Sequence, residues 1–141
     1  TFAIPDQLQA RDDSGTDVYL ATSKLFFNAF MGRNLLVNAT LRGTRANQTG
    51  LLGFGGDRNN SYEPMAEGSV GVFVTRRWLI GAEYRQKPDN LGAVAEDNWS
   101  DLYVAWFPDR RVSVTAAWAE LGDIGGLTDQ TGPYLSIQAN F

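Results

Sequence analysis

The sequence contains no cysteine and no histidine. Disulfide bonds are therefore excluded, and so are metal sites built from cysteine and histidine ligands. A catalytic mechanism that needs an imidazole base, such as the Ser-His-Asp arrangement, is excluded as well. We expect no enzymatic activity, no cofactor and no bound metal.

Long hydrophobic runs are also missing, so no transmembrane helix is predicted. The mean hydropathy of -0.25 is typical of a soluble protein. Strands that cross a bilayer give similar values, because their lipid-facing residues alternate with residues that face the lumen. The net charge of -4 argues against a nucleic-acid partner.

Alternation with a period of two residues is the main pattern that is present, and it predicts β-strands. It occurs over residues 18–29, 34–45, 66–75, 77–87, 98–107, 111–121 and 132–141. Each segment has about the length of a tilted strand that crosses a bilayer, and no helical periodicity is visible. We predict an all-β fold, an antiparallel up-and-down transmembrane β-barrel, with about seven strands in residues 18–141.

The connections between these segments alternate in length. Residues 30–33, 76–77 and 107–110 form short ones, whereas residues 46–65, 88–97 and 122–131 form long ones. Barrels of the bacterial outer membrane have short periplasmic turns and longer external loops. With a periplasmic carboxyl terminus, every short turn is predicted to be periplasmic.

Aromatic residues on the apolar parity fall near the ends of the segments. In a membrane barrel such residues form two girdles at the lipid–water interfaces, whereas the core of a soluble sandwich gives no reason for this sorting. The first segment is less regular: Tyr19, Leu25 and Phe27 are predicted on the apolar face, but Leu20 and Phe26 lie on the other parity. The predicted girdle residues are Tyr19, Phe27, Trp78, Tyr84, Trp106, Trp118 and Phe141.

The end of the chain, from Tyr134 to Phe141, reads YLSIQANF. It resembles the carboxy-terminal strand of Gram-negative outer-membrane β-barrel proteins, and the chain as a whole looks like the carboxy-terminal half of an uncharacterised bacterial barrel family. The resemblance implies a bacterial outer-membrane location with lipids as partners. It also implies that Leu135, Ile137 and Phe141 form the signal read by the barrel-assembly machinery. Ala139 departs from the pattern, which often has a bulkier residue there.

The predicted strand count is odd, whereas single-chain bacterial barrels have even counts. Residues 1–17 are expected to be an external segment, or to include a weak extra strand over residues 1–10 that is interrupted by Pro5. The other interpretation, which we favour, is that strands from an amino-terminal part or from another chain complete a larger barrel.

Charged residues on the polar parity are predicted to form a stripe across neighbouring strands. Such a stripe is expected either to filter solutes in a lumen or to serve as a structural ion-pair network. Its members are Arg42, Glu67, Glu83, Arg85, Asp101 and Tyr103.

Charged residues also gather in the connections. The short turns carry arginines, which are expected to bind lipid phosphates or to be simply solvated; these are Arg33, Arg76, Arg77, Arg110 and Arg111. The long loops carry acidic residues that match no calcium-binding pattern and are expected to be solvated; these are Asp57, Glu63, Asp89, Glu96, Asp97, Asp123 and Asp129.

Three functions are compatible with these features. The first is a passive, porin-like pore with a charged lumen stripe. The second is a structural or interaction barrel with a filled lumen that anchors a partner. The third is a soluble β-domain that binds a ligand.

Overall fold

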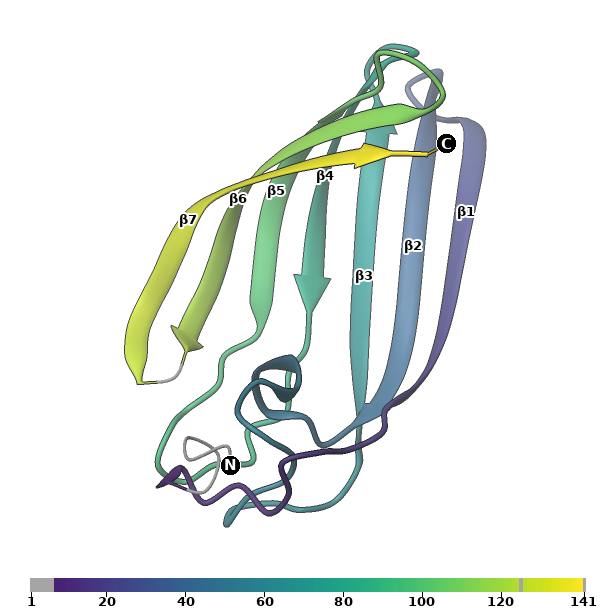
Figure 1. Cartoon of the computed structure of the whole chain (residues 1–141). Helices are drawn as coiled ribbons and strands as arrows, with labels where there is room; N and C mark the ends of the chain where they lie inside the picture. The colour runs from purple at the N-terminus through teal and green to yellow at the C-terminus, as the bar shows by residue number, and fades with distance from the viewer. Residues whose placement is uncertain (1–6, 125, 141) are drawn as a thin grey trace.

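The computed structural model describes residues 7–124 and 126–140, which form one seven-stranded sheet (Figure 1). Neighbours in the chain are neighbours in the sheet, and every pair is antiparallel. The strands are β1 (Val18–Phe30), β2 (Arg33–Thr44), β3 (Glu63–Phe73), β4 (Trp78–Arg85), β5 (Trp99–Trp106), β6 (Val112–Ile124) and β7 (Leu127–Ala139). A short 3-10 helix, η1 (Asn47–Gly50), lies between β2 and β3.

The all-β class and the seven antiparallel up-and-down strands are confirmed. The first six strands agree with the prediction to within three residues, the largest differences being at Glu63 and Ile124. Figure 1 also shows the turns between β1 and β2, β3 and β4, and β5 and β6 at one end of the sheet. We call this the short-turn end, and the opposite end the loop end.

The long loop predicted over residues 122–131 is wrong. Strand β6 continues to Ile124 and β7 begins at Leu127, so the two strands form a long hairpin. The pairing shifts register on both sides of Gly122, which has a φ of 58°, and Asp129 has a φ of 51°. Such bulges interrupt the two-residue alternation without ending a strand, and this hid the extension.

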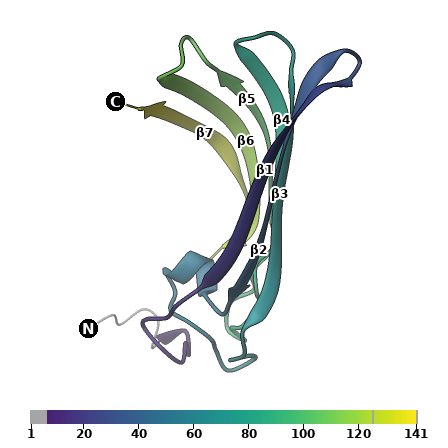
Figure 2. The ribbon, with the colours of Figure 1, turned by 90° about the vertical axis from the view of Figure 1, so that its right-hand side faces the viewer.

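The sheet has two edges, β1 and β7, and no ladder joins them within the described residues. Figure 2 shows that β5, β6 and β7 bend toward the side on which η1 lies, so the sheet has a concave face. Because seven strands alternate in direction, β1 and β7 run the same way. The predicted weak strand over residues 1–10 falls partly outside the described residues, and residues 7–9 form a turn instead of a strand.

The two faces of the sheet differ in chemistry. The convex face carries apolar side chains that are exposed, with Leu102 70% and Ile137 68% exposed. The concave face carries the polar parity of the strands, together with a few packed apolar residues such as Leu79 and Ala105, which are 3% and 4% exposed. None of the described helical segments is long and apolar enough to span a bilayer.

Tyr103 fills the middle of the concave face. Gly71, Gly81 and Tyr103 occupy the same row across β3, β4 and β5. A Cβ atom at Gly81 would lie 2.5 Å from the Tyr103 ring, and one at Gly71 would lie 2.9 Å from its hydroxyl oxygen. The two glycines therefore leave the space that the tyrosine occupies.

Candidate functional site

The predicted charged stripe begins with Glu67, which lies between two arginines on the concave face. Its Oε1 is 3.1 Å from Nη2 of Arg42, and its Oε2 is 3.2 Å from Nη2 of Arg85. The register explains this arrangement, because Glu67 is directly opposite Arg85 on β4 and opposite Thr40 on β2. The Arg42 and Glu67 side chains are each 15% exposed, so the pair is shielded from much of the solvent.

Two further carboxylates extend the stripe along β4 and β5. Glu83 lies 3.9 Å from Arg85 and is directly opposite Asp101. No Lys or Arg nitrogen of the described chain lies within 4.0 Å of the Asp101 carboxylate. The structure thus brings together all five predicted charges, and it places Tyr103 in the next row.

Sequence reasoning missed Asp17, which precedes β1. Its Oδ2 lies 3.7 Å from Nη1 of Arg42, so the stripe continues to the edge of the sheet. Asp17 lies in the segment that was expected to be external, and only the register of β1 on β2 brings it to this arginine.

The stripe borders a hollow on the concave face. This hollow has a volume of about 560 Å³ and is lined by Glu83, Asp101 and Tyr103, among others. A second hollow of about 510 Å³ adjoins Arg85 and Trp99. Small polar side chains complete the wall, and one of them, Asn38, donates a hydrogen bond of 2.7 Å to the Ser69 hydroxyl.

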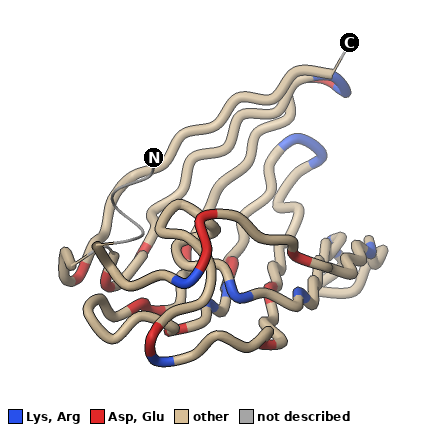
Figure 3. The backbone as a smooth tube through the Cα atoms, turned by 60° about the horizontal axis from the view of Figure 1, so that its bottom comes forward, with Lys and Arg blue, Asp and Glu red and all other residues tan. Residues whose placement is uncertain are grey.

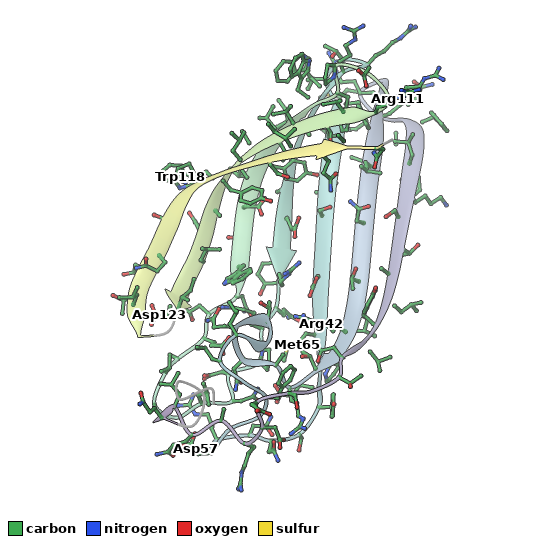
Figure 4. The ribbon with its side chains drawn as sticks, viewed as in Figure 1. Arg42, Asp57, Met65, Arg111, Trp118 and Asp123 are labelled. Carbon is green, nitrogen blue, oxygen red and sulfur yellow. The ribbon has the colours of Figure 1, made fainter. Side chains whose placement is uncertain are left out.

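Four of the seven predicted girdle residues lie on the convex face. Trp78 and Trp106 are paired in register near the short-turn end, with their rings stacked and their centroids 5.9 Å apart. Tyr84 and Trp118 are also exposed and lie farther from the short turns along their strands; Figure 4 labels Trp118. Ile137 and Leu135, two residues of the predicted assembly signal, are also exposed on β7, to the same extent as each other. Phe141 lies outside the described residues.

The placement of Tyr19 on the apolar face is wrong. Tyr19 pairs with Arg42 and lines a hollow with Glu67, so it faces the concave side. The register instead puts Leu20, Lys24 and Phe26 on the convex face. The two-residue alternation did not identify the convex face of β1, because this strand has apolar residues at both odd and even positions. Phe27 is 73% exposed and lies between Phe26 and Phe30, where the pairing of β1 with β2 is interrupted by a bulge, so the register does not assign it to a face.

The segments at the loop end fold together. We call the described residues 7–17, 45–62 and 86–98 the cap. Phe54 exchanges two backbone hydrogen bonds with Asp12, and the Asn90 side chain donates to Asn47 at 2.9 Å. Arg58 pairs with Asp89. Asn47 and Asn90 are both fully buried, so the cap has a polar interior of its own.

A buried ion pair lies inside the cap. Nζ of Lys87 is 3.8 Å from Oε2 of Glu96, and their side chains are 1% and 0% exposed. The Glu96 carboxylate accepts the backbone N–H of Gln48 at 3.0 and 3.1 Å. Lys87 also lies over the Trp99 ring, 4.6 Å from its centroid. The pair therefore connects η1, through Gln48, with Trp99 on the concave face.

Burial has a direct electrostatic effect on this pair. It raises the pKa of Glu96 and lowers the pKa of Lys87, because loss of solvent penalises both charged forms. The expectation that Glu96 is solvated is therefore wrong. Leu91 and Val94, two apolar residues of the same loop, are buried, and their presence in the sequence could have indicated a folded loop. Asp57, by contrast, is exposed, and the Gly92 backbone N–H bonded to it lowers its pKa.

The backbone of η1 is strained beside this carboxylate. Gln48 and Thr49 have φ angles of 46° and 57°, a left-handed conformation that costs of the order of 1 kcal/mol or more per residue. Gln48 donates its N–H to Glu96 from that conformation. The buried carboxylate thus accepts a hydrogen bond from a residue in a strained conformation.

Residues 1–138 match the model of a family described as "Protein of unknown function (DUF3034)". The chain belongs to the DUF3034 family. Searches of curated proteins and of solved structures found no match. Within the described ranges of this DUF3034 chain, no three acidic side chains are grouped so that they could hold a metal ion.

Proposed function

We propose that this DUF3034 chain forms part of the wall of a bacterial outer-membrane β-barrel that acts as a passive pore with a charged lumen stripe. The proposal rests on one observation: the two faces of a single curved sheet have opposite chemistry, and the apolar face is the exposed one. In the proposed orientation, the convex face contacts lipid, the concave face lines the lumen, and the short-turn end is periplasmic.

The apolar face favours lipid contact over the soluble alternative. Exposed side chains include Leu41 at 56%, Val70 at 46%, Ile80 at 50%, Leu102 at 70%, Leu135 at 68% and Ile137 at 68%. They lie on five different strands of one face, whereas soluble monomers rarely expose contiguous apolar patches beyond a few hundred Å². A bilayer covers such a face without a protein partner.

Closure of the barrel requires strands beyond these seven. Because β1 and β7 run in the same direction, joining them directly would create a parallel seam. Transmembrane barrels of this class have antiparallel neighbours throughout and no open edge. We therefore propose that an odd number of further strands, from elsewhere in the polypeptide or from another chain, joins β1 to β7.

The charge of the stripe predicts the selectivity of the pore. Arg42 and Arg85 supply two positive charges, whereas Asp17, Glu67, Glu83 and Asp101 supply four negative charges. The balance of -2 attracts cations into a narrow lumen. We therefore expect cation-selective conductance.

Planar-bilayer recording of the full-length protein tests this proposal. Neutralising Glu83 and Asp101 together (Glu83→Gln with Asp101→Asn) should reduce the preference for K⁺ over Cl⁻. The matched control, Leu102→Ala, changes the convex face and should leave the selectivity unchanged. Absence of conductance at every voltage would overturn the proposed pore. A protein that stays soluble without detergent would overturn the proposed membrane barrel.

A structural barrel with a filled lumen is the second candidate. The packing of Tyr103 over Gly71 and Gly81 and the folded cap at the loop end both favour it. It predicts silent bilayers together with a second chain that co-purifies at a fixed ratio. A conducting protein that purifies alone would exclude it.

A further inference from the structure

The arginines of the short turns form one connected surface. Arg33 donates a hydrogen bond from Nη1 to the Val74 carbonyl, which ties the first turn to the second. The backbone N–H of Phe107 donates to the Arg77 carbonyl at 2.8 Å, which ties the third turn to the second. Arg76, Arg77, Arg110 and Arg111 therefore extend from neighbouring turns, and all four are exposed.

We propose that Arg76, Arg77, Arg110 and Arg111 form a rim that binds the phosphates of anionic phospholipids at the periplasmic surface of the membrane. This inference rests on the proposed function, because it needs the convex face to be in a bilayer. Arg33 has a different role, since its guanidinium is already bonded to the Val74 carbonyl. It ties the turn between β1 and β2 to the turn that carries Arg76 and Arg77.

Within the described turns, a single carboxylate accompanies the four arginines of the rim, so most of their positive charge is not compensated. Among the described residues of the three turns, Asp109 is the single acidic one, and its Oδ1 accepts the backbone N–H groups of Arg111 and Val112. Figure 3 shows basic residues at the tips of the hairpins and acidic residues gathered toward the loop end. In Figure 4, Arg111 lies at the opposite end of the molecule from Asp57. The short-turn end is thus a distinct cationic surface.

The rim also lies at the depth where phosphates are expected. Trp78 directly follows Arg76 and Arg77 in the chain and stacks on Trp106 on the convex face. Tryptophan favours the headgroup level of a bilayer, so the neighbouring arginines reach the phosphate layer. The planar guanidinium group binds phosphate through two parallel hydrogen bonds, which lysine cannot reproduce.

Vesicle experiments with the full-length protein test this inference. Insertion is measured with vesicles of phosphatidylcholine alone and with vesicles that also contain phosphatidylglycerol. Phosphatidylglycerol should increase the affinity of the wild type, and each arginine removed should lower that affinity by roughly fivefold. High salt should abolish the increase, because exposed charges are screened over about 10 Å at 0.1 M salt.

Two double variants with equal charge changes separate a local rim from overall charge. Arg76→Gln with Arg77→Gln should remove most of the phosphatidylglycerol effect while leaving insertion into phosphatidylcholine unchanged. Arg11→Gln with Arg58→Gln, at the loop end, should retain the effect. Equal losses in the two doubles would overturn the rim and leave only a general charge effect.

Lysine variants address folding and geometry together. Arg76→Lys with Arg77→Lys keeps the charge, so it should fold and insert, but it should bind phosphatidylglycerol vesicles less tightly than the wild type. Phosphatidylglycerol dependence that persists in the glutamine double overturns the rim, even if the protein inserts. A wild type that enters neither vesicle overturns the proposed function itself, and the rim with it.

Discussion

At the scale of single residues, the buried pair of Lys87 and Glu96 orders a loop even though burying the two charges is unfavourable in free energy. Moving two charges out of water costs several kcal/mol per ion, and their attraction offsets this only in part. Both pKa directions reflect that cost. What Glu96 supplies is a pair of acceptor oxygens for the Gln48 N–H. We therefore expect the hydrogen-bond acceptor to contribute more to the stability of the cap than the negative charge does.

Two substitutions at Glu96 separate these contributions. Glu96→Ala removes the acceptor and leaves Lys87 buried without its partner, which should destabilise the cap by about 3–5 kcal/mol. Glu96→Gln also removes the negative charge beside Lys87, but it keeps an acceptor oxygen for the Gln48 N–H, so it should cost less than Glu96→Ala. Limited proteolysis of residues 45–62 in the membrane-inserted protein measures the difference. Equal cleavage rates for the two variants would contradict this account.

Lys24 is the residue that fits the convex face least well. It pairs with Val37 in the middle of β1, and its ammonium lies 4.8 Å from the centre of the Phe26 ring. A lysine on the lipid face of a barrel costs about 2–4 kcal/mol at the midplane and less near the interfaces. Its long side chain lowers that cost by extending toward the headgroups.

Replacement of Lys24 by leucine should therefore raise the free energy of unfolding in a bilayer, by up to about 2–4 kcal/mol. Ser23→Leu serves as the control, because Ser23 pairs with Asn38 and lies on the concave face. Urea titration in vesicles measures both variants. A gain in Ser23→Leu that equals the gain in Lys24→Leu would argue against lipid contact at this strand.

At the scale of secondary-structure elements, the packing of Tyr103 connects β3, β4 and β5. A Cβ atom at Gly71 would lie 2.9 Å from both the Tyr103 hydroxyl oxygen and Cδ1 of Leu79. A Cβ atom at Gly132 on β7 would meet nothing within 4 Å. A glycine-to-alanine substitution is therefore sterically crowded on β3 and unhindered on β7.

Gly71→Ala should destabilise the sheet by about 1–3 kcal/mol, because it overpacks the concave face. Gly132→Ala should be neutral or slightly stabilising, since it only restricts the unfolded chain. Adding Tyr103→Phe to Gly71→Ala should recover part of the loss by removing the hydroxyl. Thermal unfolding followed by circular dichroism measures all three, and equal effects at the two glycines would contradict the packing described.

At the scale of the whole molecule, the charges buried in the cap make its stability depend on pH. The pKa of Glu96 is raised above its ordinary value of 4.5. Its stabilising contribution is thus complete below about pH 4.5 and is lost as pH rises through the raised pKa. The pKa of Lys87 is lowered from 10.5, so its contribution is complete above that value and is lost as pH falls through the lowered pKa.

Raising the pH through the raised pKa of Glu96 should therefore loosen the cap, and the proposed pore should conduct more as Glu96 ionises. Single-channel recording between acidic and neutral pH measures this dependence. Glu96→Gln, which cannot ionise, should remain closed over the same range. An identical pH profile in the variant and the wild type would assign the effect to another group.

The sequence predicted the strands and most of their faces, because a two-residue period is a local property that any single strand displays. It did not predict the face of β1, where apolar residues occupy both parities and only pairing with β2 settles the side. It also missed the bulges around Gly122 and the burial of Glu96. Those features depend on contacts between residues distant in the chain, such as Glu96 with Gln48.

The free edges of the sheet have a consequence for handling the protein. Strands β1 and β7 each present 13 residues with one unpaired backbone side. In water, such long unpaired edges are templates for strand addition by neighbouring molecules, which leads to aggregation. Expression of these seven strands alone should therefore give insoluble, β-rich material. Recovery of folded protein should depend on adding detergent before molecules associate through their edge strands.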